Sequence, residues 1–316
     1  MVARVAVGLG LVAYLGLSGA INWGRLLGLA NAWELTIAAA ILLVLVVLAA
    51  SWRLCLVLSG QGLRLPLSAS FRLSLVGALF GNFLPGSNGG DLARVYFATR
   101  LNTGRRTEIA TALLVDRLVG LSALLAMPLL IALPGRALVP HTAPIGGLVF
   151  ASVLALGALL GLFATGLHPD GAARRLVLSV TGRTRFGPHA LRVFESVRTL
   201  RQNPAILLAG FAVSLLIQTL IVLAIQVILL ANGARATSWG AALLTPFGML
   251  ANALPLTPGG LGVGEAAFES LFLFAGVTGG AEAILSWRLL TTLIDICGGG
   301  LLAAGRTDIP VTRAHG

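Results

Sequence analysis

The sequence predicts an all-α integral membrane protein with six spanning helices and two re-entrant helical hairpins, arranged as two repeats of inverted topology. Hydrophobic residues make up 57% of the chain and charged residues only 10%, whereas a soluble domain carries about 25% charged residues. The pattern N-x-L-P-x-x-x-G-G occurs at 82–90 and again at 252–260, once in each half of the chain. Apolar segments broken by glycine and proline at matching places in two halves indicate the binding site of a transporter.

The charged and metal-binding residue types exclude several classes of function. All 22 basic residues are arginine, and without lysine the chain has neither a Walker P-loop nor a lysine Schiff base. The net charge is +11, but the arginines gather in short connections between apolar runs, as the positive-inside bias requires. We therefore expect no nucleic-acid partner. Cys55 and Cys297 lie in apolar runs and the histidines are scattered, so we expect no disulfide framework, metal site or cofactor.

Six apolar runs are long enough to cross the ~30 Å of hydrocarbon in a bilayer at ~1.5 Å per residue. We interpret the first run as a retained helix, and a cleaved signal peptide is the alternative. The runs span about 5–21, 33–58, 109–133, 143–167, 205–232 and 281–304.

Two further segments, 71–101 and 239–278, each hold two shorter apolar pieces joined by one copy of the repeated motif. The piece 71–84 would extend about 21 Å as a helix, which is too short for a full crossing. Pro85 ends this piece, because the residue before a proline is pushed out of the α region. We therefore predict that each segment enters and leaves the membrane on the same side.

Charge sets the topology of this single polytopic domain. The connection 168–204 is rich in arginine, which places it in the cytoplasm. Counting spans from there puts both termini in the cytoplasm and opens the two hairpins to opposite faces. Repeat one, 33–133, and repeat two, 205–304, are then inverted relative to one another. We expect the protein in the plasma membrane, with 168–204 either simply solvated or forming an amphipathic helix on anionic headgroups.

An acidic residue follows each glycine-rich motif. Asp91 and Glu265 both precede an apolar piece, so each is expected at the N-terminus of a returning half-helix. A carboxylate is stabilised there by the helix dipole. Each acid is therefore interpreted either as a helix cap or as a proton carrier that holds an arginine.

Arg117 and Arg288 lie inside predicted spans, each after its acid. An arginine inside the membrane is costly and normally faces a partner or a water-filled cavity. We interpret both as facing the hairpins, where a guanidinium binds phosphate through two nitrogens. The alternatives are snorkelling to the interface and, for Arg117, a local pair with Asp116. Asp295 is a third intramembrane acid, which we expect to pair with an arginine at a helix end.

Asparagines and glycine pairs complete the candidate binding site. An asparagine at a helix end often only caps backbone carbonyls, and glycine pairs permit sharp turns and close backbone approach. Exposed N–H groups at the start of a half-helix also form an anion site. The residues concerned are Asn82, Gly89, Gly90, Asn252, Gly259 and Gly260.

The stretches 82–94 (NFLPGSNGGDLAR) and 255–265 (PLTPGGLGVGE) resemble the two signatures of the flippase-like transmembrane domain of lysylphosphatidylglycerol synthases. The resemblance covers nearly the whole chain. It implies a helical domain with two inverted repeats and re-entrant hairpins that moves lipids between leaflets. The family's acid and arginine pairs map onto Asp91, Arg117, Glu265 and Arg288, with Arg94 as the alternative to Arg117.

One departure from that family bears on function. The synthases carry a soluble aminoacyl-transfer domain after the membrane part, and only about a dozen residues follow the last predicted span here. We therefore expect no enzyme but a flippase or scramblase for an anionic phospholipid or a polyprenyl-phosphate-linked lipid, passive or proton-coupled. The alternative is a non-transporting membrane scaffold for a separate lipid synthase or glycosyltransferase, with 168–204 as its docking surface.

Overall fold

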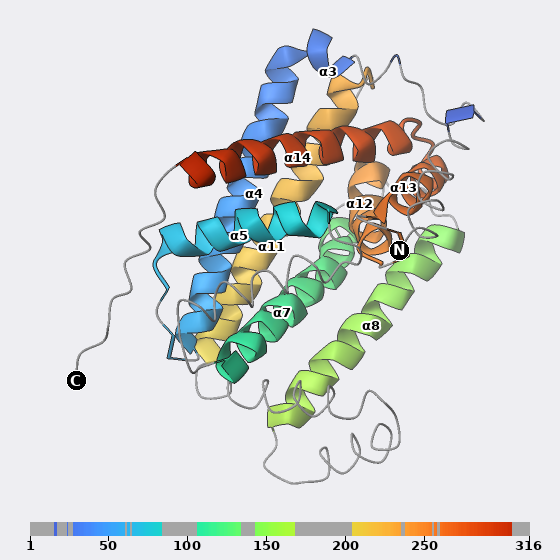
Figure 1. The fold of residues 1–316 in the computed structure, drawn as a ribbon. Coiled ribbons are helices and arrows are strands. Elements are labelled where there is room, and N and C mark those ends of the chain that lie inside the picture. Colours follow the sequence, from blue (N-terminus) through green and yellow to red (C-terminus); the bar gives the residue numbers. More distant parts are fainter. Residues whose placement is uncertain are drawn as a thin grey trace.

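The computed structural model describes residues 16–17, 24, 28–60, 62–63, 65–83, 106–133, 143–167, 204–234, 238–254, 256–257 and 260–304. Every regular element in these ranges is a helix, which confirms the all-α prediction for this part of the chain (Figure 1). The helices are α3 (Gly28–Asn31), α4 (Trp33–Gly60), α5 (Leu67–Phe83), α7 (Arg106–Ala132), α8 (Ala143–Leu167), α11 (Pro204–Ala231), α12 (Trp239–Asn252), α13 (Val263–Phe274) and α14 (Gly280–Ala304).

Four of the predicted spans are long and apolar enough to cross a membrane. They are Trp33–Gly60, Ala112–Ala132, Pro144–Gly161 and Pro204–Ala231, which are α4, α11 and most of α7 and α8. The predicted span 281–304 coincides with the helix α14, which is not among these four. It lies across α4 and α11 in Figure 1 and packs on both. The predicted span 5–21 lies almost wholly outside the described residues.

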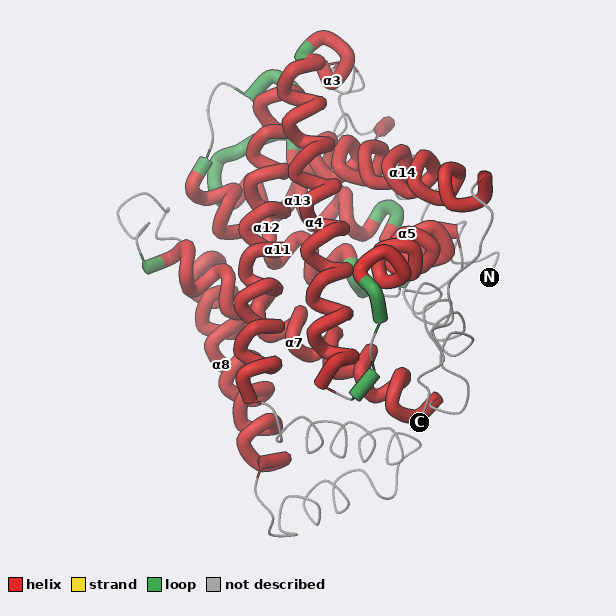
Figure 2. Tube along the Cα trace, turned by 90° about the vertical axis from the view of Figure 1, so that its left-hand side faces the viewer, coloured by secondary structure: helices red, strands yellow, loops and turns green. Residues whose placement is uncertain are grey.

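The helices α4 and α11 form the central pair and run in opposite directions. Gly28, just before α4, lies against the carbonyl of Ala231 at the end of α11. Near the other end of the pair, a Cβ added at Gly210 of α11 would lie 4.0 Å from Val57 of α4. Figure 2 shows the two helices still side by side after a quarter turn. Both have 28 residues and are long and apolar enough to cross a membrane, which fits their central position.

The segment 239–278 folds as the predicted pair of short helices. α12 has 14 residues and α13 has 12, so they extend about 21 and 18 Å, less than the ~30 Å of a bilayer core. They pack closely because glycines on α12 face larger residues: a Cβ at Gly248 would lie 2.5 Å from the Phe268 ring. In the first half, α5 is the first piece of the predicted hairpin, and residues 84–101 lie outside the described residues.

One short helix of each half packs on the last helix of the other half. The indole N–H of Trp239, at the start of α12, donates to the carbonyl of Ile131 on α7 at 3.1 Å. Likewise, α5 of the first half packs on α14, the last helix of the second half. A Cβ added at Gly298 of α14 would lie 2.7 Å from Leu75 of α5. Each half therefore contributes to the surroundings of the other half's hairpin.

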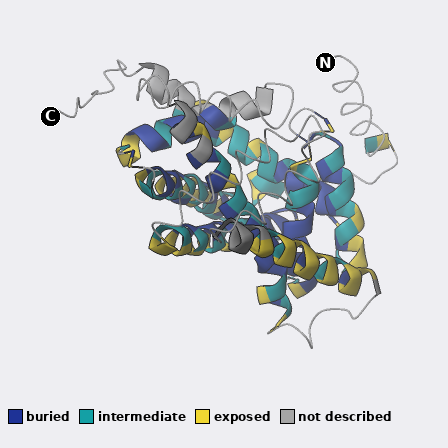
Figure 3. Ribbon diagram, turned by 90° about the horizontal axis from the view of Figure 1, so that it is seen from below, coloured by how far each residue is buried: buried dark blue, intermediate teal, exposed yellow. Residues whose placement is uncertain are grey.

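Among the described residues, buried side chains form two large apolar cores, and a small third cluster joins α4 and α11. The first core joins α4, α5 and α7 around Leu54, Val57 and Ile109. The second joins α7 and α11 to α12, α13 and α14 around Phe268 and Phe272. Figure 3 shows buried residues facing the interior and exposed ones at the periphery. Large apolar side chains such as Phe150, which is 63% exposed on α8, suit contact with lipid tails.

Candidate functional site

The break between α12 and α13 is shaped by two glycines. Gly260 and Gly262 have φ angles of +72° and +79°, in the left-handed region that side chains disfavour. The hydroxyl of Thr257 donates to the carbonyl of Leu261 at 2.7 Å and braces the turn. The chain therefore reverses sharply and starts α13 close to the end of α12.

Glu265 lies at the N-terminus of α13, as the sequence predicts. Its Oε2 accepts a hydrogen bond of 2.6 Å from the N–H of Gly262, and its side chain is completely buried. Its other oxygen, Oε1, lies 3.3 Å from Nη2 of Arg288. Glu265 therefore caps α13 and also contacts an arginine, whereas its role as a proton carrier stays a prediction.

Arg288 brings three segments together. It extends from α14, and its Nη2 donates to Oδ1 of Asn252, the last residue of α12, at 3.0 Å. Gly264 makes this approach possible, because a Cβ there would overlap Oδ1 of Asn252 and lie 3.3 Å from Nη2 of Arg288. The side chain of Arg288 keeps 15% of its exposure, whereas that of Glu265 keeps none. Of the two charged side chains in this cluster, only that of Arg288 is partly exposed.

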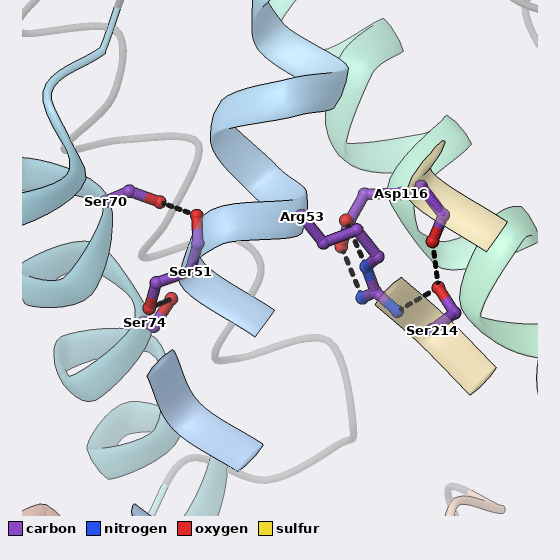
Figure 4. Close-up of polar contacts among 7 residues, drawn as sticks. Ser51, Arg53, Ser70, Ser74, Asp116 and Ser214 are labelled. Carbon is purple, nitrogen blue, oxygen red and sulfur yellow. Dashed lines mark hydrogen bonds and ion pairs between the residues drawn. The ribbon is translucent and has the colours of Figure 1, made fainter. Parts of the chain in front are cut away.

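A second buried ion pair has a different geometry (Figure 4). Arg53 of α4 donates to Asp116 of α7 through Nε at 2.7 Å and through Nη2 at 2.9 Å. Its Nη1 donates to the hydroxyl of Ser214 on α11 at 3.0 Å. A Cβ at Gly120 would lie 2.9 Å from Nη1, so this glycine leaves space for the guanidinium. Both carboxylate oxygens are engaged, and the pair ties three spanning helices together.

A group of serines holds α5 against α4 (Figure 4). The hydroxyl of Ser70 donates to the carbonyl of Ser51 at 2.7 Å. The hydroxyl of Ser51 lies 3.0 Å from that of Ser74. Small hydroxyl residues let membrane helices approach closely while pairing their own polar groups. These serines fix the position of the first short helix on the central pair.

The structure brings together four of the residues predicted for the site: Asn252, Gly260, Glu265 and Arg288. It separates Arg117 from the protein interior, because Arg117 is exposed on α7. Asn82 lies in the last turn of α5, where its side chain is not described. The other predicted residues, Gly89, Gly90, Asp91, Arg94 and Gly259, lie outside the described residues.

Sequence reasoning missed the buried arginine of the first half. We expected Arg117 to face the first hairpin, to snorkel to the interface or to pair locally with Asp116, and the structure shows that Asp116 is held by Arg53, 63 positions earlier. The signal available in the sequence was that Asp116 and Arg53 both interrupt apolar runs. A buried pair between Asn232 and Ser286, 3.0 Å apart, links the end of α11 to α14 and was also missed. Asp295 is buried on α14.

No group of three or more histidine, cysteine, aspartate or glutamate side chains that could hold a metal ion occurs within the described ranges. The cluster at α12–α13 holds a guanidinium, a carboxylate and an amide. These groups can bind an anion and exchange a proton.

The fold and this cluster define a polytopic helical membrane protein with a buried arginine at a break between two half-helices. The model of the family described as the lysylphosphatidylglycerol synthase TM region matches residues 1–299, and the chain belongs to this family. The predicted resemblance is thereby confirmed. Neither the curated proteins nor the solved structures include a match to the chain.

Proposed function

We propose that this protein is a lipid transporter, a flippase or scramblase, that binds the phosphate of an anionic phospholipid or polyprenyl-phosphate-linked lipid at Arg288. The observation that carries the proposal is the position of Arg288. Its guanidinium lies among apolar helices, at a helix break, and 15% of the side chain stays exposed. An arginine in such surroundings marks a ligand pathway by default, and its planar fork matches a phosphate.

The neighbours of Arg288 suit reversible binding. Glu265 balances its charge in the empty state, and Asn252 orients Nη2 through a neutral hydrogen bond of 3.0 Å. A buried charge without a partner is strongly unfavourable, so this arrangement keeps the site stable between lipids. The protein would work as a carrier without cofactor or enzymatic step, either passively or coupled to protons.

The packing between the two halves supports the inverted-repeat part of the proposal. The central helices α4 and α11 are antiparallel, and each half's short helix packs on the other half's last helix. Each half also has a polar clamp between its first and last helix: Arg53 with Asp116, and Asn232 with Ser286. Repeats of inverted topology with a site between them allow alternating access by rocking of one unit against the other.

The test is lipid movement by the purified protein in liposomes, with a panel of labelled anionic, zwitterionic and polyprenyl-phosphate lipids. We expect movement of at least one phosphate-bearing lipid by the wild type. Arg288→Lys should reduce it severely, because lysine keeps the charge but loses the bidentate fork.

Arg53→Lys is the matched control, since it makes the same change in the other buried pair. It should lower the unfolding temperature while the folded fraction still moves lipid. Transport by Arg288→Lys at the wild-type rate, with equal amounts of folded protein, would contradict the proposed role of Arg288. A folded wild type that moves no lipid of the panel would instead favour the scaffold hypothesis.

A further inference from the structure

Glu265 occupies the place that an anionic ligand would take. The N-terminus of a helix attracts negative charge through its N–H groups and its dipole. At α13 this position is filled by the protein's own carboxylate, whose Oε2 accepts from the Gly262 N–H at 2.6 Å. The same carboxylate faces Arg288. When a lipid phosphate approaches Arg288, the carboxylate of Glu265 therefore already contacts the guanidinium that the phosphate would bind.

The contact between Glu265 and Arg288 is weaker in geometry than the other buried pair. Oε1 of Glu265 lies 3.3 Å from Nη2 of Arg288 but makes no hydrogen bond within the described part of the chain. The same nitrogen donates to Asn252 at 3.0 Å. By contrast, Asp116 accepts two hydrogen bonds of 2.7 and 2.9 Å from Arg53. The contact between Glu265 and Arg288 suits exchange of partners, whereas the ion pair between Asp116 and Arg53 suits permanent attachment.

Loss of Arg288 would leave Glu265 as an uncompensated buried charge. Its side chain is fully buried, and a buried charge without a partner is strongly unfavourable. α12 and α14 are the helices packed against α13. α12 has no titratable residue, and α14 carries Arg288 as well as Glu282 and Asp295. On α13 itself, Glu269 accepts from the N–H of Ala281 at 3.1 Å.

We infer that the carboxylate of Glu265 and the lipid phosphate compete for Arg288, and that binding of the phosphate transfers one proton from water to Oε1 of Glu265. The charge then balances in both states: Arg288 faces ionised Glu265 when the site is empty, and faces phosphate beside neutral Glu265 when it is loaded. Release of the lipid reverses the exchange and returns the proton. This inference rests on the proposed function and gives Glu265 a specific part in it.

The experiment measures binding of a water-soluble phosphatidylglycerol with two six-carbon chains to the purified protein in detergent. Because binding takes up a proton, wild-type affinity should fall with rising pH, by up to tenfold per pH unit where Glu265 is ionised in the empty site (about one coupled proton). Glu265→Gln keeps an oxygen to accept from Gly262 and cannot ionise. At pH 8 its affinity for the lipid should be at least about tenfold higher than that of the wild type, because binding no longer requires the uptake of one proton. Position 265 should then add no pH dependence to the affinity.

Glu269→Gln is the matched control, because it makes the same change one helical turn further along α13. It should follow the wild type at every pH. Calorimetry in buffers of different ionisation enthalpy gives a second readout. It should report about one proton taken up per lipid by the wild type at pH 8 and none by Glu265→Gln. Proton uptake by the wild type decides the question alone if Glu265→Gln does not fold.

The outcomes separate this inference from the function on which it rests. If the wild type binds the lipid without proton uptake, or Glu265→Gln binds more weakly, Glu265 only positions Arg288 and the exchange is wrong, while the transporter stands. If Arg288→Gln binds as well as the wild type, both the binding site and the exchange fail.

Discussion

Replacing Gly264 by alanine tests whether the close approach of Asn252 and Arg288 matters. Gly264 lies in the first turn of α13 without a left-handed backbone, so alanine causes no backbone strain there. Its added Cβ would overlap Oδ1 of Asn252 and come within 3.1 Å of Cγ of that residue. The end of the Asn252 side chain must therefore turn away from Arg288. The backbone of α13 can remain as it is.

The magnitude follows from one lost hydrogen bond. A hydrogen bond to a charged group contributes about 1.5–3 kcal/mol, and alanine gains up to ~1 kcal/mol over glycine inside a helix. Gly264→Ala should therefore destabilise the protein by only about 0.5–2 kcal/mol. Ligand binding should suffer more, because the guanidinium loses its orientation. A loss of 1.5–3 kcal/mol corresponds to roughly 10- to 150-fold in affinity.

The assay compares Gly264→Ala with Gly157→Ala. Gly157 lies inside α8 with no atom within 4 Å of an added Cβ, so its replacement should leave lipid movement and thermal unfolding close to wild type. Both variants would be measured for thermal unfolding in detergent and for lipid movement in liposomes. Wild-type lipid movement by Gly264→Ala would refute the requirement for an oriented Arg288. An equal loss in Gly157→Ala would show that the effect is not specific to the site.

Two further predictions concern stability. Asp116→Asn leaves Arg53 buried without its counter-charge and should cost about 3–5 kcal/mol, seen as a lower unfolding temperature; an unchanged temperature would mean that water reaches this pair. Gly248→Ala places a Cβ 2.5 Å from the Phe268 ring, and such overpacking should cost about 1–3 kcal/mol. The same thermal measurement checks it, and a variant as stable as wild type would show that α12 and α13 can move apart.

The sequence by itself determined the local features of this protein. Long apolar runs define the spanning helices because the bilayer requires every backbone polar group to be paired within the segment. The motif at 252–260 and Glu265 marked the break between α12 and α13, because glycine, proline and a capping acid act on their own neighbours in the chain. At this break, Asn252, Gly260 and Glu265 come together with Arg288.

Only the tertiary structure decided which intramembrane charges face each other. Arg53 meets Asp116 across 63 positions and Ser214 across 161, distances at which no local pattern predicts a contact. The rotation of a helix about its axis is set by packing against its neighbours. On α7 this rotation turns Asp116 inward and leaves the adjacent Arg117 exposed. The sequence alone therefore shows which predicted helix carries a charged residue. The residue that pairs with this charge depends on which helices pack together.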